Sequence, residues 1–412
     1  MKKVLVIFDG LADLPTKSLR DKTPCEVART PNLDFFTKNG KLGHMYPLDK
    51  KIIPGSDNAL ISIFGNNPKE CKRGVYEAIG SGFSLKNNFL AFRINLGTIE
   101  NLKTKKVIDR RAGRTLTTKE ALELSKAINK NVNLPCKFEF KSTIQHRGVL
   151  VLKGKFSENI TNIDTEYSKK KSDKLHFSKS LDNKSESIKT AHILNDFIYQ
   201  AYNILNKHPV NTKRRRKGLY PANMIFTRGG GIKIPKINSY KNWMSINSMP
   251  LEVGIAKLSK MKNFSTSLPK LKTIDVYKNL YLSLHKNVKF AKKILKKQHK
   301  NFSGCYIHFK ETDIPGHDNK PLEKVKMLQY IDHYFFGFLK KFAIENDWQI
   351  VVTCDHSTPC KLKNHSNHPV PVLVYNGKDK DDTKRFTERE SRRGKLNEIF
   401  GKNFMKKTGL NR

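Results

Sequence analysis

The chain lacks the features of a secreted, disulfide-bonded or membrane-spanning protein. Its six cysteines are scattered and form no Cys-x-x-Cys pair, which favours reduced thiols over a disulfide framework or a zinc site. No apolar run approaches the ~20 residues of a membrane helix. The apolar stretch Val4–Phe8 ends at Asp9, short of the roughly 7–15 residues of a signal-peptide core. We therefore expect a cytoplasmic protein without a membrane partner.

Acidic residues are scarce, since 37 Asp and Glu stand against 79 Lys and Arg and leave a net charge of +42. Such an excess invites nucleic-acid binding. It is spread over the whole chain, however, and its one dense run, 213–217, holds none of the aromatic residues on which bases stack. We predict that residues 213–217 form a solvated surface and that no specific nucleic acid is bound. Part of the charge is expected to attract a small anionic substrate.

At 412 residues the chain is long enough for two domains, and its two ends share one pattern of apolar and polar residues. Continuous apolar and β-branched runs there predict strands buried on both faces, separated by stretches with helical spacing. The predicted strands are 4–8, 305–309, 349–353 and 370–375, and the predicted helices are 30–36, 280–295 and 322–344. This alternation favours an α/β fold with a mainly parallel sheet sandwiched between helices.

The middle of the chain has a different pattern of strand, helix and loop signals. Strand signals occupy 89–95, 137–143 and 148–153, a helix is predicted over 190–205, and the polar stretch 168–189 is expected to be an exposed loop. We predict an inserted α+β cap domain at 77–249, between two parts of a metal-binding core at 1–76 and 250–412.

Residues of the kinds that bind metals follow the predicted strands. Asp9 follows the first strand, and Asp313 and the pair Asp355-His356 each follow a later one. Open α/β sheets place their sites beyond the carboxyl ends of parallel strands, so these side chains are expected to meet. Asp355 and His356 stand on a predicted loop, where consecutive side chains can both reach one metal.

A second group of ligands is expected beside the first. Asp313 and His317, four residues apart across a Pro-Gly pair, could turn toward a second metal, with His365 as a further nitrogen ligand. Mixed carboxylate and imidazole ligands suit Mn²⁺, Zn²⁺ or Co²⁺ better than a pure magnesium site. Two metals about 3.5–4 Å apart stabilise both the attacking and the leaving oxygen in a displacement at phosphorus. One of them would lower the pKa of the Ser56 hydroxyl, so that this serine could attack a phosphate.

A substrate phosphate or carboxylate would need cationic partners, and arginine offers a fork that matches both. The middle region offers Arg93, Arg110, Arg111, Arg114, His146, Arg147 and Arg228, and all but Arg93 are predicted to bind substrate. The three glycines after Arg228 match neither a Walker loop nor a dinucleotide fingerprint. We therefore expect no nucleotide cofactor.

Many short motifs occur here in the order found in one known family. They are Phe8-Asp9-Gly10, Lys22-Thr23-Pro24, Thr30-Pro31-Asn32-Leu33-Asp34, Pro54-Gly55-Ser56-Asp57, Asp109-Arg110-Arg111-Ala112-Gly113-Arg114, His146-Arg147-Gly148, His208-Pro209-Val210-Asn211, Pro221-Ala222-Asn223, Thr312-Asp313, Gly316-His317-Asp318, Asp355-His356-Ser357-Thr358-Pro359 and Pro369-Val370-Pro371. With them the chain, from residue 4 to about 400, resembles the archaeal-type 2,3-bisphosphoglycerate-independent (cofactor-independent) phosphoglycerate mutases of the alkaline phosphatase superfamily.

The resemblance implies an alkaline-phosphatase-like three-layer sandwich with an inserted transferase cap, hinged near 75–76 and near 250. It implies an isomerase of glycolysis and gluconeogenesis that interconverts 3-phosphoglycerate and 2-phosphoglycerate through a phosphoserine at Ser56, without 2,3-bisphosphoglycerate. It also implies two divalent ions, Mn²⁺ foremost, with Zn²⁺, Co²⁺ or Mg²⁺ as alternatives. One ion would be bound by Asp9, Ser56, Asp355 and His356, and the other by Asp313, His317 and His365.

The chain departs from the family pattern in three places, one of which is the altered small-residue pattern before Gly254-Ile255-Ala256. A segment that is usually glycine-rich reads SLPKLK at 267–272, in which Lys270 could contact phosphate, and Glu311 stands where glycine is common. A metal-dependent phosphomonoesterase or another phosphomutase on the same core is the first alternative, and it would need a different cap. A basic RNA-binding protein on a degenerate core is the second, but it would lack metal ligands that this chain keeps. The oligomeric state stays open, a homo-oligomer included.

Overall fold

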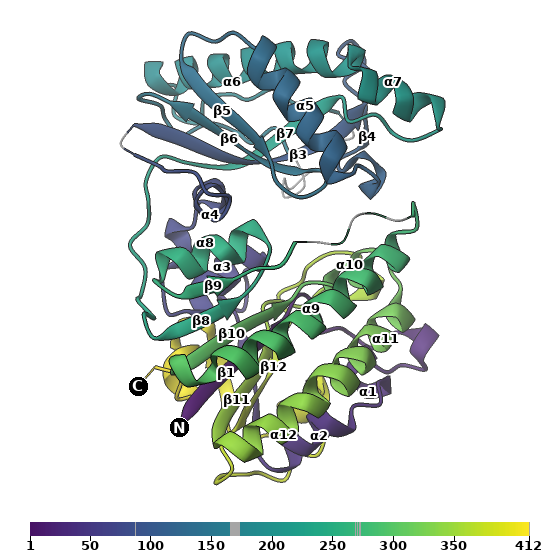
Figure 1. Cartoon of the computed structure of the whole chain (residues 1–412), viewed down its shortest axis with the longest axis vertical. Coiled ribbons are helices and arrows are strands. Elements are labelled where there is room, and N and C mark those ends of the chain that lie inside the picture. Colours follow the sequence, from purple (N-terminus) through teal and green to yellow (C-terminus); the bar gives the residue numbers. More distant parts are fainter. Residues whose placement is uncertain (87, 165–173, 268, 270, 272, 412) are drawn as a thin grey trace.

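The chain, in a computed structural model, folds into two lobes that are each built around a β-sheet (Figure 1). The structure describes residues 1–86, 88–164, 174–267, 269, 271 and 273–411. Both ends of the chain lie in the lower lobe of the figure, and the middle of the chain forms the upper lobe. Lys270, with its predicted phosphate contact, lies outside the described residues.

The lower lobe holds an eight-stranded mixed sheet with the order β13-β2-β12-β11-β1-β10-β8-β9. Its strands are β1 (Lys2–Phe8), β2 (Lys41–Tyr46), β8 (Trp243–Ile246), β9 (Lys262–Phe264), β10 (Gly304–Phe309), β11 (Trp348–Cys354), β12 (Val370–Tyr375) and β13 (Asn397–Phe400). β12 runs antiparallel to both of its neighbours, and the other strands share one direction. The predicted mainly parallel sheet is confirmed.

Helices cover both faces of this sheet. They are α1 (Pro24–Val27), α2 (Pro31–Lys38), α3 (Ser56–Ile63), α8 (Pro250–Leu258), α9 (Val276–Gln298), α10 (Asp313–His317), α11 (Pro321–Ile331), α12 (Gly337–Asn346), α13 (Glu388–Ser391) and α14 (Phe404–Lys407). α8 leads outward from β8 to β9, and α9 leads back from β9 to β10, so right-handed crossovers place these two helices on opposite faces. Figure 1 shows α2, α11 and α12 on the side of α9, and α3 beside α8.

The upper lobe is an α+β unit with an antiparallel sheet. Its strands are β3 (Phe89–Ile99), β4 (Val107–Asp109), β5 (Lys137–Ser142), β6 (Arg147–Lys153) and β7 (Met224–Gly231), and its helices are α5 (Thr118–Asn131), α6 (Ser185–Lys207) and α7 (Pro209–Arg216). Helices α5 to α7 cover the top of the sheet in Figure 1. Strand β8, at 243–246, pairs in the lower sheet although it falls within the predicted cap 77–249. The predicted domain division therefore remains a proposal.

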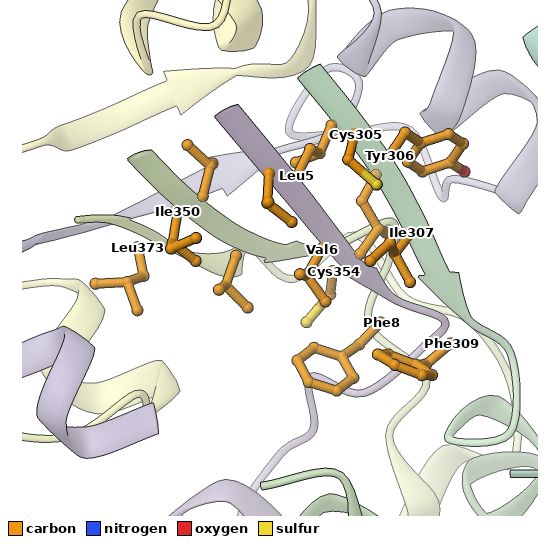
Figure 2. Packing of buried hydrophobic residues seen from close by; sticks show 14 of the residues in the cluster. Leu5, Val6, Phe8, Cys305, Tyr306, Ile307, Phe309, Ile350, Cys354 and Leu373 are labelled. Atoms are coloured by element: carbon orange, nitrogen blue, oxygen red, sulfur yellow. The ribbon is translucent and has the colours of Figure 1, made fainter. Parts of the chain in front are cut away.

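The core of the lower lobe lies between the sheet and its helices. Side chains of β1, β10 and β11 are buried along their whole apolar runs, as predicted for strands covered on both faces. Figure 2 shows Phe8 and Phe309 side by side near the carboxyl ends of β1 and β10, with ring centroids 6.1 Å apart. This apolar packing fixes the strand ends from which the polar site begins.

The fold corrects three details of the sequence analysis. The expected loop 168–189 gives way to α6 from Ser185, while 165–173 lie outside the described residues. Within the run 213–217, Arg214 is buried rather than solvated, because its guanidinium reaches the carbonyls of Ala112 and Tyr220 and the Glu120 carboxylate. Third, a π-helical turn interrupts the predicted helix 322–344.

The π-helical turn spans Asp332–Phe336 between α11 and α12. It points the Asp332 carboxylate at the N-terminus of α2, where the N–H of Leu33 donates to it at 2.7 Å and the side-chain amide of Asn32 donates at 3.0 Å. A carboxylate is favourable at this positive helix end. Among the described residues no helix combines the length and the apolar character of a bilayer crossing.

Helix α4 (Arg73–Gly80) joins the lobes and packs on α8 through two glycines. A Cβ atom on Gly80 would lie 1.8 Å from the Pro250 carbonyl oxygen, and a Cβ atom on Gly254 would lie 1.9 Å from the Tyr76 carbonyl oxygen. Both obstacles are backbone atoms, which cannot turn away as a side chain can. The two helices therefore touch backbone to backbone at the base of the upper lobe.

We predict that Gly254→Ala lowers the free energy of unfolding by about 1–3 kcal/mol or more, because α4 and α8 must separate. Urea denaturation followed by circular dichroism measures this change. Gly337→Ala is the matched control, since Gly337 has helical angles (φ −59°, ψ −38°) and its nearest neighbour would be an Asn32 atom at 3.4 Å. Equal destabilisation by both variants would contradict the close packing of α4 on α8.

Candidate active site

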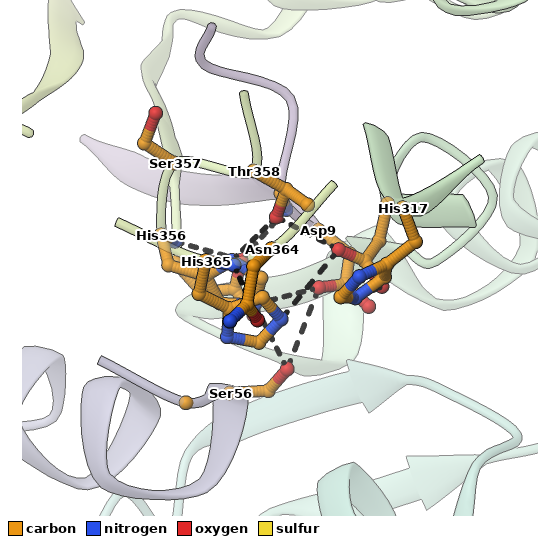
Figure 3. Close-up of polar contacts among 12 residues, drawn as sticks. Asp9, Ser56, His317, His356, Ser357, Thr358, Asn364 and His365 are labelled. Atoms are coloured by element: carbon orange, nitrogen blue, oxygen red, sulfur yellow. Dashed lines mark hydrogen bonds and ion pairs between the residues drawn. The ribbon is translucent and has the colours of Figure 1, made fainter. Parts of the chain in front are cut away.

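Three parallel strands deliver the predicted metal ligands to one edge of the lower sheet. Asp9 directly follows β1, Asp313 begins α10 after β10, and Asp355 and His356 follow β11. β10, β1 and β11 are neighbours and parallel, so their carboxyl ends meet at this edge. Figure 3 shows the resulting cluster, with Ser56 beside it.

Ser56 is the first residue of α3, and it is only 8% exposed. Its Oγ lies 3.2 Å from Nε2 of His356 and 3.4 Å from Oδ1 of Asp9. The positive end of α3 favours negative charge on this oxygen. Ser56 therefore joins the first group of predicted ligands, with its oxygen turned toward them.

Asp313, His317 and His365 form the second group, directly beside the first. Nε2 of His317 lies 3.2 Å from Oδ2 of Asp313, and Nε2 of His365 lies 3.8 Å from Oδ1 of the same carboxylate. The rings of His356 and His365 stack with centroids 3.8 Å apart, so the two groups share a border. Residues 313–317 form one short helix, which places Asp313 and His317 a turn apart on one side.

The three imidazoles are oriented alike. Their Nδ1 atoms meet oxygen acceptors, which are the carbonyl of Lys363 for His317 (3.2 Å), the carbonyl of Pro54 for His365 (2.9 Å) and the hydroxyl of Thr358 for His356 (3.0 Å). An acceptor at Nδ1 keeps the proton there and leaves Nε2 for a metal. Burial, reinforced by His356, lowers the pKa of His365 to about 3, so its ring is neutral, as a metal ligand must be.

Asp355 has one carboxylate oxygen without a hydrogen bond among the described residues. Its Oδ1 accepts from the backbone N–H groups of Gly10 and His356, whereas its Oδ2 meets only the imidazoles of His308 and His356 at 3.6 Å. Burial, together with the negative charge of Asp9, raises the pKa of Asp355 to about 7. A divalent cation would relieve both the unpaired oxygen and the repulsion. The donor set therefore fits divalent metal ions.

Lys310 is a site residue that the sequence analysis missed. Its Nζ lies 2.5 Å from Oδ2 of Asp9 and 2.9 Å from Oε1 of Glu252, a buried residue of α8. Burial alone would raise the pKa of Asp9, but Lys310 and His356 together hold that pKa below its usual range. The signal for Lys310 was its place directly after β10, three residues before Asp313. Glu252 had no such signal.

Cationic side chains from the upper-lobe side line the same cavity. The ligands Asp9, Ser56, Asp313, His317 and His365 line it on one side, and on the other it is lined by Arg73, Arg93, Arg111, Arg114, His146, Arg147 and Arg228. Burial, and then Arg111, lowers the pKa of Arg147 to about 10. Burial, and then Arg147, lowers the pKa of His146, whose two ring nitrogens have no hydrogen bond among the described residues. This concentration of buried positive charge fits an anionic ligand.

Arg110 and Arg114 are among the predicted cationic residues that have acidic partners. Arg110 is absent from the cavity lining described above and donates from Nε to Asp164 at 2.6 Å. Arg114 lines the cavity but also crosses to the lower lobe, where its Nη1 lies 3.0 Å from Oδ2 of Asp318. The Tyr277 hydroxyl donates to the same oxygen at 2.9 Å. The substrate contact of Arg110 stays a prediction that its geometry does not favour.

The lining includes two arginines that the sequence analysis did not select as site residues. Glu77 of α4 accepts from Nε of Arg73 at 2.6 Å and lies 3.2 Å from Nε of Arg93. Burial opposes ionisation of Glu77, but the two arginines lower its pKa. Arg73 stands on the helix that joins the lobes, where no motif indicated a binding role.

Comparison with known proteins agrees with this geometry. The model of the family described as 2,3-bisphosphoglycerate-independent phosphoglycerate mutase matches residues 37–211. The protein of that name from Pyrococcus furiosus is 38% identical over 411 residues, which cover 97% of this chain and 94% of the relative. The chain belongs to the 2,3-bisphosphoglycerate-independent phosphoglycerate mutase family. The expected family and enzyme class, an isomerase, are confirmed.

Other relatives and solved structures extend the match over the whole mutase. The protein of the same name from Saccharolobus islandicus is 35% identical over 96% of this chain and 94% of its own length. The solved cofactor-independent phosphoglycerate mutase of Thermoplasma acidophilum is 27% identical, covers 98% of each chain and has a TM-score of 0.56. A solved protein of Pyrococcus horikoshii is 30% identical, covers 99% of this chain and 97% of its own, and has a TM-score of 0.74.

We predict that Asp313→Ala and His356→Ala each lower Mn²⁺ affinity by more than the ~100-fold that loss of an outer partner can cause, because each removes a direct ligand. Calorimetric titration of EDTA-stripped protein measures this affinity. His333→Ala, at an exposed histidine, is the control and should bind as the unmodified mutase does. Unchanged binding by either ligand variant would contradict the assignment.

Proposed function

We propose that this mutase interconverts 3-phosphoglycerate and 2-phosphoglycerate by way of a phosphoserine at Ser56. The carrying observation is the position of Ser56 Oγ, within 3.4 Å of Asp9 and His356, in a cavity whose opposite wall is cationic. A phosphoryl group bound there would meet the nucleophile on one side and arginines on the other. The expected glycolytic role and cytoplasmic location belong to this proposal, and 2,3-bisphosphoglycerate has no part in it.

The transfer is balanced in two steps. In the first, Ser56 Oγ loses its proton and attacks phosphorus, the bond from phosphorus to the carbon-3 oxygen breaks, and that oxygen takes up a proton. In the second, the carbon-2 hydroxyl of the same glycerate loses its proton and attacks the phosphoserine. Ser56 Oγ leaves with the bonding electrons and is protonated again. No oxidant, nucleotide or net proton is consumed.

The residues that would hold two divalent ions are the two groups described above. Asp9, Ser56, Asp355 and His356 would hold one ion, and Asp313, His317 and His365 the other. Their mixed carboxylates and imidazoles suit Mn²⁺, with Zn²⁺, Co²⁺ or Mg²⁺ as alternatives. Such ions, when bound, lower the pKa of a hydroxyl and neutralise charge on phosphoryl oxygens.

The charge of Lys310 would complement these ions from the protein itself. Its ammonium is held by Asp9 and Glu252 beside the position that a phosphoryl group on Ser56 would occupy. Burial disfavours the charged lysine, but Asp9 and Glu252 raise its pKa above the usual range, so the positive charge is kept. Fixed charge of this kind stabilises the transferring group without reorganisation.

The upper lobe would decide between transfer and hydrolysis. A phosphoserine open to water would be hydrolysed, and the enzyme would then be a phosphatase. Arg114 and Asp318 tie the upper lobe to the lower lobe beside the cavity, and Arg111, Arg147 and His146 offer anion contacts on its wall. Glycerate held by these groups would stay in place while its second hydroxyl replaces the first.

We predict that Ser56→Ala abolishes conversion of 3-phosphoglycerate, because no oxygen remains to accept the phosphoryl group. An assay coupled to enolase measures the rate, and circular dichroism checks that the variant folds. Ser62→Ala, at a buried serine on the same helix, is the matched control and should keep most activity. Turnover by a folded Ser56→Ala variant would overturn the phosphoserine step.

We predict that Arg147→Ala lowers kcat/KM by about 100-fold or more, since a charge-assisted contact in a dry site contributes about 1.5–3 kcal/mol and a neighbouring anion would be left unpaired. Arg216→Ala, an exposed arginine of α7, removes the same charge from the surface and should leave kcat/KM within about twofold. If both variants lose activity equally, the cavity arginines act only through net charge.

A further inference from the structure

The hydroxyl of Thr358 touches a ligand from each metal group (Figure 3). It donates to Oδ1 of Asp313 at 2.8 Å, and it lies 3.0 Å from Nδ1 of His356. A threonine hydroxyl has one proton, which goes to Asp313, so toward His356 it can only accept. The Nδ1 atom of His356 therefore carries a proton, and Nε2, which faces Ser56 and Asp9, is the nitrogen that can bind a metal.

The backbone of Thr358 is fixed as firmly as its side chain. Thr358 is fully buried, and its N–H donates to the Ala12 carbonyl at 3.0 Å. Its own carbonyl accepts from Nζ of Lys324 at 2.9 Å, and the same ammonium donates to the Gly10 carbonyl at 3.0 Å and to Asp13 at 2.8 Å. The loops after β1 and β11 are thus joined at Thr358, which has little freedom to turn its hydroxyl elsewhere.

Two glycines leave room for this arrangement. Gly10 has a left-handed φ of +56°, and a Cβ atom there would lie 2.4 Å from Oγ1 of Thr358 and 2.5 Å from Oδ1 of Asp313. A Cβ atom on Gly316 would lie 2.3 Å from the Thr358 carbonyl oxygen. A side chain at Gly10 would part the hydroxyl from the carboxylate. The Asp-Gly pair after β1 therefore serves the hydrogen bond as well as the turn.

We infer that Thr358 is a positioning residue shared by the two metal sites and couples their affinities for metal. With its proton given to Asp313, the hydroxyl fixes which carboxylate oxygen remains for the second site, since Oδ2 is the one that faces His317. With its lone pair given to His356, it fixes the tautomer that the first site needs. A metal ion that orders one site through this hydroxyl therefore also orders the other site, and the effect is the same in both directions.

The inference deepens the proposed function, because it rests on the proposed two-metal site. Loss of a residue that hydrogen-bonds to a metal ligand typically lowers metal affinity by about 10–100-fold. A partner shared by two sites should affect both. Ordinary structural support would instead change stability and leave the affinities of the intact sites alone.

The test compares three variants of the full chain by calorimetric titration of EDTA-stripped protein with Mn²⁺. Thr358→Val keeps the branched shape and removes the hydroxyl, and Thr358→Ser restores it. Ser357→Ala is the matched control, because the Ser357 hydroxyl is also fully buried but donates to the Ala12 carbonyl, away from the cluster in Figure 3. Unfolding of each stripped variant is measured alongside, to separate lost stability from lost affinity.

We expect Thr358→Val to lose about 10–100-fold in Mn²⁺ affinity, while Thr358→Ser and Ser357→Ala stay within about threefold of the unmodified mutase. The loss should recur in two single-site backgrounds, His317→Ala and Asp9→Ala, which leave the first and the second site respectively. Unchanged affinity of Thr358→Val, a loss in only one background, or an equal loss in Ser357→Ala would overturn the shared role. If the unmodified mutase itself binds no second Mn²⁺, the proposed two-metal site fails first, and the inference with it.

Discussion

Three carboxylates, two of them buried and one half-buried, repel one another at one edge of a sheet, and much of the site exists to neutralise and orient them. Asp9, Asp313 and Asp355 arrive there because β1, β10 and β11 are adjacent and parallel. Lys310 balances part of this charge at a distance of 2.5 Å from Asp9. The rest is suited to divalent ions, because the imidazoles present Nε2 and one oxygen of Asp355 has no hydrogen bond among the described residues.

The opposite wall of the cavity carries the opposite charge. Buried arginines of the upper lobe face the carboxylates of the lower lobe, and Glu77 and Asp318 hold some of them in place. Phosphoryl and carboxylate groups are both anionic, so they can pair directly with the arginines of one wall. They can bind at the carboxylates of the other wall through metal cations. Closely packed glycines bring α4 and α8 into backbone contact at the base of the upper lobe.

The sequence was sufficient to predict the lower sheet and the carboxylates that follow its strands. Each of Asp9, Asp313 and Asp355 comes within a few residues of a strongly apolar run, and topology brings such ends together. The same sequence could not separate Arg110 from Arg111. These neighbours point to different partners, Asp164 and the cavity, and that difference depends on tertiary packing rather than on composition.

Other residues escaped the sequence analysis because their roles depend on long-range contacts. Glu252 matters through Lys310, which is 58 positions later in the chain, and nothing in its own helix marks it. Arg214 lies in a basic run that predicts solvent exposure, yet carbonyl groups of a distant turn bury it. Thr358 belongs to a motif that was noticed for Asp355 and His356, and only the geometry assigns its hydroxyl to two partners.

The most direct test of the account is conversion of 3-phosphoglycerate by the unmodified mutase, stripped with EDTA and then assayed with and without Mn²⁺ and 2,3-bisphosphoglycerate. The account predicts that 2-phosphoglycerate forms only when the metal is restored, and at the same rate whether or not 2,3-bisphosphoglycerate is present. Release of inorganic phosphate in place of 2-phosphoglycerate, or full activity in the stripped protein, would contradict it.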